Sequence, residues 1–167
     1  QYVASEDTLQ AIVFWMFGSL QGATWPKLAI LAVVLFVSIP ALLSQAWQLT
    51  ALRLGEEHAQ SLGVPVKRLR LTTLGIVSIL TATAVCFSGA LGFIGIVAPH
   101  LARMSVGEDQ RYFLPMSAIL GAVLLSAAST ASKTLAMGAV LPLGIVTAFI
   151  GVPFFFMIVI TQKRSYW

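Results

Sequence analysis

Only a few side chains in this sequence could carry out chemistry, and they do not form a recognisable site. His58 and His100 are far apart in the chain, so no metal-ligand spacing exists, and Cys86 is the single cysteine, which excludes an internal disulfide. No Gly-x-x-x-x-Gly-Lys-Ser/Thr loop is present, so the chain does not bind ATP through a Walker motif. The sequence therefore predicts no catalytic residue, metal or cofactor in this chain.

His100 is the most reactive candidate, and it follows Pro99 in an apolar run. A proline inside a helix removes a backbone donor and kinks the helix. Polar groups at membrane depth must find partners within the protein. We therefore expect His100 and Arg103 to satisfy the freed backbone groups or to contact neighbouring helices, which makes all three residues structural.

The composition places these residues in a membrane protein. Of 167 residues, 58% are hydrophobic and 10% are charged, whereas a soluble domain carries roughly a quarter charged residues. A chain of this length cannot hide so much apolar surface in its own core. The sequence predicts an all-α membrane protein whose solvent is the lipid bilayer. The net charge of +4 does not indicate nucleic-acid binding, because the basic residues lie at the ends of apolar runs.

The apolar runs are long enough for about five transmembrane helices, since one span needs about 20 residues. The predicted spans are residues 28–47, two segments of 71–104 separated by a glycine-containing break at 89–92, 112–132, and 134–162 with a preceding loop. Residues 8–20 are too short to span and predict an interfacial or re-entrant helix. Trp15 and Trp25 fit anchors at the membrane interface.

The distribution of Lys and Arg predicts how the spans are oriented. With five spans, eight basic residues fall on one side, and Lys27 and Lys133 fall on the other. Cytoplasmic loops carry an excess of Lys and Arg. We therefore expect the 48–70 loop and the C-terminus to be cytoplasmic, and residues 1–27 and the 138–142 turn to be external.

The predicted spans contain small polar residues but no acidic ones. Proton-coupled carriers and many ion-coupled carriers use buried carboxylates, so this absence argues against a secondary carrier. Ala122, Ser126 and Thr130 are spaced by four and share one helix face. Such a face serves tight helix packing or lines a polar path, and the sequence leaves both interpretations open.

A short polar island, residues 54–64, separates the first two predicted spans. Gly55 can end the preceding turn, so that Glu56 and Glu57 stand at a helix start, where carboxylates interact favourably with the helix dipole. Gly63 suits the end of the same helix. The island therefore predicts a short helix bounded by two glycines.

This short helix is predicted to carry a small apolar face. Ala59 and Leu62 are three residues apart, which places them on one side of a helix, and Val64 follows the closing glycine. A compact helix with an acidic start and an apolar face indicates a docking surface for a soluble partner. A solvated loop without a partner is the alternative interpretation.

Three long motifs occur in order along the chain. They are Leu54-Gly55-Glu56-Glu57-x-Ala59-x-x-Leu62-Gly63-Val64, then Gly92-Phe93-Ile94-Gly95-x-x-x-Pro99-His100-x-x-Arg103, then Leu141-Pro142-x-Gly144-Ile145-Val146-Thr147-Ala148-x-Ile150-Gly151-x-Pro153-Phe154-Phe155. Together they resemble the permease family of type II ABC importers, which move iron–siderophores, haem and vitamin B12. The resemblance covers essentially the whole chain but only the C-terminal half of such a permease, roughly the last five of ten spans. A start at Gln1 also fits a piece of a longer chain, a processed product or a truncated protein.

The resemblance implies roles for particular regions. Residues 1–167 would form a single transmembrane permease domain, with the 48–70 loop as its cytoplasmic coupling loop. The loop would sit in a cleft of a separate ATPase, which would hold ATP and Mg²⁺. The residues of this ATPase-coupling site would be Gly55, Glu56, Glu57, Ala59, Leu62, Gly63 and Val64. The residues of the family's structural motifs would be Pro99, His100, Arg103, Pro142, Gly144, Gly151 and Pro153.

The resemblance also implies a contact on the external side. Lys133 stands where family members often carry an Arg that meets an acidic residue of a periplasmic or lipoprotein solute-binding protein. Lysine keeps the charge but loses the bidentate fork of arginine. Thr50, on the cytoplasmic side, replaces a frequent Asn of the family.

The function implied is that of a permease subunit in the bacterial cytoplasmic membrane, paired with a second copy or a paralogue. The expected solute is a ferric siderophore, with haem or vitamin B12 as alternatives. Two other classes stay open: a membrane subunit that docks a soluble partner without transporting, and a secondary carrier. ATP hydrolysis would belong to a partner chain in the first case.

Overall fold

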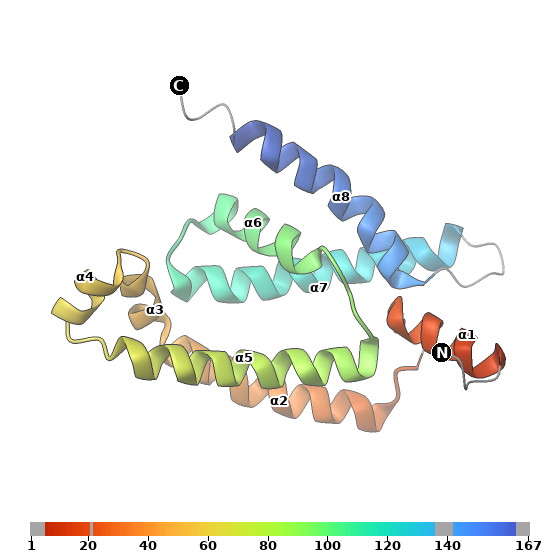
Figure 1. Cartoon of the computed structure of the whole chain (residues 1–167), viewed down its shortest axis with the longest axis horizontal. Helices are drawn as coiled ribbons and strands as arrows, with labels where there is room; N and C mark the ends of the chain where they lie inside the picture. Colours follow the sequence, from red (N-terminus) through yellow and green to blue (C-terminus); the bar gives the residue numbers. More distant parts are fainter. Residues whose placement is uncertain (1–5, 21, 136–141, 163–167) are drawn as a thin grey trace.

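The computed structural model describes residues 6–20, 22–135 and 142–162, and every regular element within them is a helix. The helices are α1 (Glu6–Met16), α2 (Trp25–Ser44), α3 (Ala46–Leu52), α4 (Glu56–Ser61), α5 (Val66–Ser88), α6 (Ile94–Val106), α7 (Gln110–Leu135) and α8 (Leu143–Gln162). They follow one another as shown in Figure 1. The prediction of an all-α membrane fold is confirmed.

Three of the described helices, α2, α5 and α7, are long and apolar enough to cross a membrane. Helix α6 has 13 residues, or about 20 Å of helix, which is less than the roughly 30 Å of a bilayer core. Helix α8 has 20 residues, the same number as α2. The predicted total of five spans therefore stays a prediction.

The predicted helix boundaries are accurate at glycines and less so elsewhere. The run 71–104 divides as expected, because α5 ends at Gly89, whose φ is +73°, and α6 begins at Ile94. The first span is displaced: α2 begins three residues earlier than predicted, with Pro26 in its first turn, and ends at Ser44. The predicted 138–142 turn lies outside the described residues except for Pro142.

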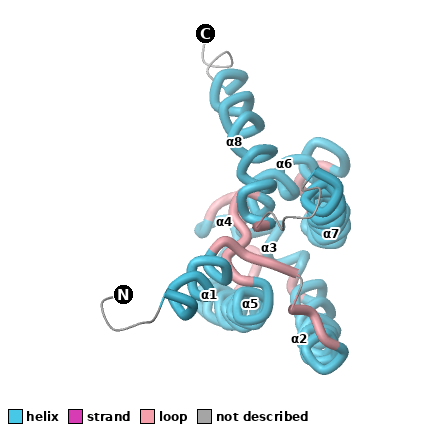
Figure 2. Tube along the Cα trace, turned by 90° about the vertical axis from the view of Figure 1, so that its right-hand side faces the viewer, coloured by secondary structure: helices cyan, strands magenta, loops and turns pink. Residues whose placement is uncertain are grey.

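The helices gather into two pairs. Helix α2 runs beside α5, and α6 pairs with α7, while α8 crosses the second pair and its C-terminal end projects away from the other helices (Figures 1 and 2). Helices α3 and α4 lie at one end of the molecule, next to the turn between α6 and α7 (Figure 1). Helix α1 and the start of α8 lie at the opposite end.

Very little of this chain is buried within itself. The described core consists mainly of small side chains in two clusters, one between α3, α4 and α5 and one between α7 and α8. Large apolar side chains such as Phe36, Leu71 and Phe149 are exposed along the long helices. Exposed apolar surface of this extent needs lipid or another protein surface to cover it.

Candidate functional site

The polar island, residues 54–64, contains α4, which forms a compact hairpin with α3 before it, and the sequence explains the boundaries of α4. Gly55 adopts φ +112°, which favours glycine, and turns the chain between the two helices. Glu56 and Glu57 occupy the first turn of α4, as predicted. Gly63, with φ +79°, ends the helix in a Schellman motif: its N–H donates to the carbonyl of Gln60 at 2.9 Å, and the N–H of Val64 donates to that of Ala59 at 3.0 Å.

Ala59 lies inside the hairpin and does not face outwards. It is 0% exposed and packs in a cluster with Val64, Val66 and Leu69. Leu62 follows the last residue of α4 and is 51% exposed. The prediction that Ala59 and Leu62 share one apolar face is therefore wrong, because packing against α5 takes Ala59 away from the surface.

The outer surface of the hairpin is formed by other residues. Leu54 and Leu62 are exposed apolar side chains at the two ends of α4. Glu57 and His58 are exposed between them. Glu56 is turned towards α5, where its carboxylate pairs with the guanidinium of Arg70. Of the predicted coupling residues, Leu62 and Glu57 therefore have exposed side chains, whereas Ala59 and Val64 are buried inside the hairpin.

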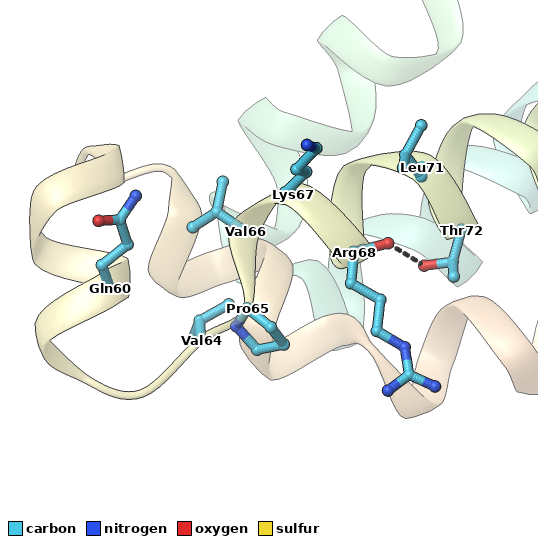
Figure 3. A pocket seen from close by; sticks show the side chains of 8 residues that line it. All are labelled: Gln60, Val64, Pro65, Val66, Lys67, Arg68, Leu71 and Thr72. Atoms are coloured by element: carbon cyan, nitrogen blue, oxygen red, sulfur yellow. Dashed lines mark hydrogen bonds between the residues drawn. The ribbon is translucent and has the colours of Figure 1, made fainter.

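A groove of about 560 Å³ lies where α4 meets α5 (Figure 3). It combines apolar side chains with Lys67 and Arg68, which point to opposite sides of the start of α5. The hydroxyl of Thr72 donates to the carbonyl of Arg68 at 3.0 Å, as the dashed line in Figure 3 marks. The exposed face of the hairpin thus continues into a basic, partly apolar surface on the next helix.

The hairpin also contacts the turn between α6 and α7. Arg53, at the C-terminal end of α3, forms an ion pair with Glu108, with 2.6 Å between Nη2 and Oε1. The hydroxyl of Thr50 accepts a hydrogen bond of 3.1 Å from the N–H of Gln110, the first residue of α7. Arg53 and Glu108 are not among the predicted site residues; the acidic pair Glu108-Asp109 directly after Gly107, between two apolar helices, is the signal that points to Glu108.

The structure places His100 and Arg103 against neighbouring helices, which is one of the two roles expected for them. The ring of His100 meets that of Phe154 in α8 edge to face, with centroids 5.6 Å apart. The guanidinium of Arg103 lies 5.9 Å from the ring centre of Phe113 in α7. Pro99 lies inside α6, one residue before His100.

The third sequence motif builds the opposite end of the molecule. The N–H groups of Leu143 and Gly144, which begin α8, donate to the carbonyls of Gly18 at 3.0 Å and Phe17 at 2.8 Å. The first N–H groups of a helix lack partners within it, so the segment after α1 caps α8. A Cβ on Gly144 would collide with the carbonyl oxygen of Phe17. This close approach explains why the motif has a glycine at position 144. Pro142 lies just before the junction.

Gly151 and Pro153 complete the described motif residues, and Gly89, just before the second motif, makes a similar close contact. Ser19 donates its N–H to the carbonyl of Ser88 at 2.9 Å, which joins the α1 segment to the end of α5. A Cβ on Gly89 would collide with the carbonyl oxygen of Trp15. Gly151 of α8 packs on Phe93, and Pro153 lies two residues further along the same helix.

Lys133 lies at the α1 end of the molecule, far from the hairpin. It is exposed in the last turn of α7, where a cation interacts favourably with the helix dipole. The residues that follow, 136–141, lie outside the described part of the chain. Among the described residues, no group of three or more His, Cys, Asp or Glu side chains could hold a metal ion.

A helical membrane domain with a compact polar hairpin between two spans has the architecture of a transporter permease subunit. Residues 1–161 match the FecCD transport family, and the chain belongs to this family. The prediction of the family is confirmed.

Named relatives and a solved structure agree with this assignment. The chain is 41% identical to an ABC transporter permease protein, MJ0087, of Methanocaldococcus jannaschii, over 98% of its length and 47% of that protein. It is 39% identical to the hemin transport system permease protein HmuU of Yersinia pestis, over 98% of its length and 49% of that protein. It is 36% identical to the molybdate import system permease protein MolB of Haemophilus influenzae, over 99% of its length and 49% of that protein.

The fold matches an inward-facing conformation of a metal-chelate type ABC transporter with a TM-score of 0.89 and 35% identity. The match covers 96% of this chain and 52% of that chain. The chain thus spans about half the length of its relatives, as the motifs predicted.

Proposed function

We propose that this chain forms half of the translocation path of a binding-protein-dependent ABC importer. The observation that carries the proposal is the α3–α4 hairpin, which is held in place by contacts within this chain. Its Schellman closure, its buried Ala59 and its ion pair to α5 fix a small helix outside the spans. A fixed, exposed helix of this kind suits a docking element that receives force from a partner.

The partner of the hairpin would be a separate ATPase that holds ATP and Mg²⁺. Leu54, Glu57 and Leu62 would contact it, because their side chains are exposed around α4. A solute-binding protein would dock at the other end, near Lys133. Among the residues that the structure describes, most cations, such as Arg53 and Arg103, lie at the hairpin end, which supports a cytoplasmic position for that end.

We propose a metal chelate as the solute, with a ferric siderophore as the first compound to test. Supporting this choice, the matching structure is of the metal-chelate type, and the motifs are those of siderophore, haem and vitamin B12 permeases. Relatives named for hemin, vitamin B12 and molybdate define the alternatives. A second permease copy or paralogue would complete the path in the membrane.

Reconstitution of the complete permease in vesicles tests the function. The vesicles should take up a ferric siderophore only when the ATPase, ATP and the binding protein are all present. Haem, vitamin B12 and molybdate are then offered in parallel to identify the solute. Uptake that follows an ion gradient without ATP would indicate a secondary carrier, and ATPase binding without uptake of any solute would indicate a docking subunit.

A further inference from the structure

Glu108 lies between two arginines at the hairpin end of the molecule. Its Oε1 is 2.6 Å from Nη2 of Arg53 and 3.5 Å from Nε of Arg103. Nη1 of Arg53 also donates to the backbone carbonyl of Glu108 at 3.1 Å. Arg53 ends α3, Arg103 lies in the last turn of α6, and Glu108 lies just before α7. One residue therefore joins the hairpin to two membrane helices.

The Arg53–Glu108 pair joins parts of the chain that are far apart in the sequence. The other described ion pair of the hairpin, Glu56 with Arg70, connects α4 to α5, which follows it directly in sequence. Arg53 and Glu108 are 55 residues apart. A force on the hairpin reaches α2 and α5 through the chain itself, but it reaches α6 and α7 only through contacts. Those contacts are the Arg53–Glu108 pair, the Thr50–Gln110 hydrogen bond and the packing of α3 on α7.

Helices α6 and α7 connect the Arg53–Glu108 contact to α8. They share the most extensive contact of any helix pair in the described chain. Helix α6 contacts α8 through His100 and Phe154 and through the close approach of Phe93 to Gly151. A displacement of α6 at its hairpin end must therefore disturb α8.

We propose that Glu108 is a positioning residue that transmits movement of the hairpin to α6 and α7. The proposal rests on the proposed function, because it assumes that a partner ATPase moves the hairpin. The pair is accessible to water, with Arg53 31% and Glu108 58% exposed in their side chains. Exposed ion pairs contribute little to folding stability, so loss of the pair should change transmission much more than folding.

The test uses the complete permease, reconstituted with its ATPase and binding protein. The quantity measured is the ratio of solute transported to ATP hydrolysed. We expect Glu108→Gln and Arg53→Gln each to lower this ratio about fivefold or more, the lower end of typical coupling between sites. The double variant should be no worse than either single variant, because both remove the same interaction.

The control is Arg111→Gln, which removes a neighbouring exposed charge that makes no ion pair among the described residues. It should leave the ratio unchanged. Raising the salt concentration should lower the wild-type ratio by a larger factor than that of Glu108→Gln, because salt screens the exposed pair that only the wild type has. A purely structural role for Glu108 would not produce this difference in salt response.

The outcomes separate the two proposals. If the wild type shows no ATP-driven, binding-protein-dependent uptake, the proposed function fails. If the wild type transports and Glu108→Gln keeps its ratio, or if the losses of the two single variants add, the positioning role fails. If Glu108→Gln does not assemble with the ATPase, Arg53→Lys replaces it: this variant keeps the charge, loses the second hydrogen bond, and should still lower the ratio.

Discussion

Phe93 and Gly151 meet so closely that only a glycine fits opposite the phenylalanine. A Cβ on Gly151 would collide with the Cβ of Phe93 and lie 2.5 Å from its Cγ. Phe93 directly precedes α6 and has a φ of +65°, a conformation that residues with a bulky side chain rarely adopt. The contact fixes the start of α6 against the middle of α8.

Gly151→Ala should therefore destabilise the protein by about 1–3 kcal/mol, the usual cost of overpacking. The added methyl group meets the base of the Phe93 side chain, which cannot rotate away from it. The measurement is the fraction of protein that stays monodisperse in detergent after heating. Gly75→Ala in α5 is the matched control, because a Cβ there meets nothing within 4 Å. Equal heat resistance of the two variants would show that α6 and α8 do not need this contact.

Substitutions in the hairpin should separate its interior from its docking surface. Leu62→Arg should leave the hairpin folded and weaken binding of the ATPase, because Leu62 is half exposed. Ala59→Arg should unfold the hairpin, since a buried unpaired charge costs several kcal/mol. Limited proteolysis reports the fold, and co-purification reports the ATPase. Normal ATPase binding by a folded Leu62→Arg variant would contradict the docking role.

Local chemistry explains what the sequence could predict about the hairpin. Two acids at the start of α4 and a glycine after its end act within one turn, so both boundaries follow from neighbouring residues. The direction in which Ala59 faces depends on Val66 and Leu69 of the next helix. No pattern inside residues 54–64 contains that information.

Distance in the chain explains what the sequence could not predict. Arg53 and Glu108 pair although three described helices, α4, α5 and α6, lie between them in the chain, and neither belongs to the periodic pattern of a span. The capping of α8 by the carbonyls of Phe17 and Gly18 is longer-range still, and it uses backbone atoms that every residue has. Such contacts depend on how the helices are arranged, which composition and spacing do not specify.

Lys133→Glu should weaken docking of the solute-binding protein, because it reverses a charge at the end opposite the hairpin. The affinity of the wild type should also fall with rising salt. Lys27→Glu is the control at the same end, since its Nζ already donates to the carbonyl of Gly22 at 2.8 Å. Binding of the purified binding protein to permease in nanodiscs measures both. Unchanged affinity and salt dependence in Lys133→Glu would exclude the docking role.

The chain expressed alone should not transport, because it forms only about half of its relatives' length and leaves large apolar side chains uncovered. In a membrane, small and polar helix faces drive association, so we expect the chain to bind the other half of the permease or copies of itself. Uptake is measured with the ATPase and binding protein present, first with this chain alone and then with the other half supplied as a separate chain. We expect uptake only in the second case, because the solute path needs surfaces from both halves. ATP-dependent uptake by this chain alone, near the level of the complete permease, would overturn both the half-permease assignment and the incomplete path.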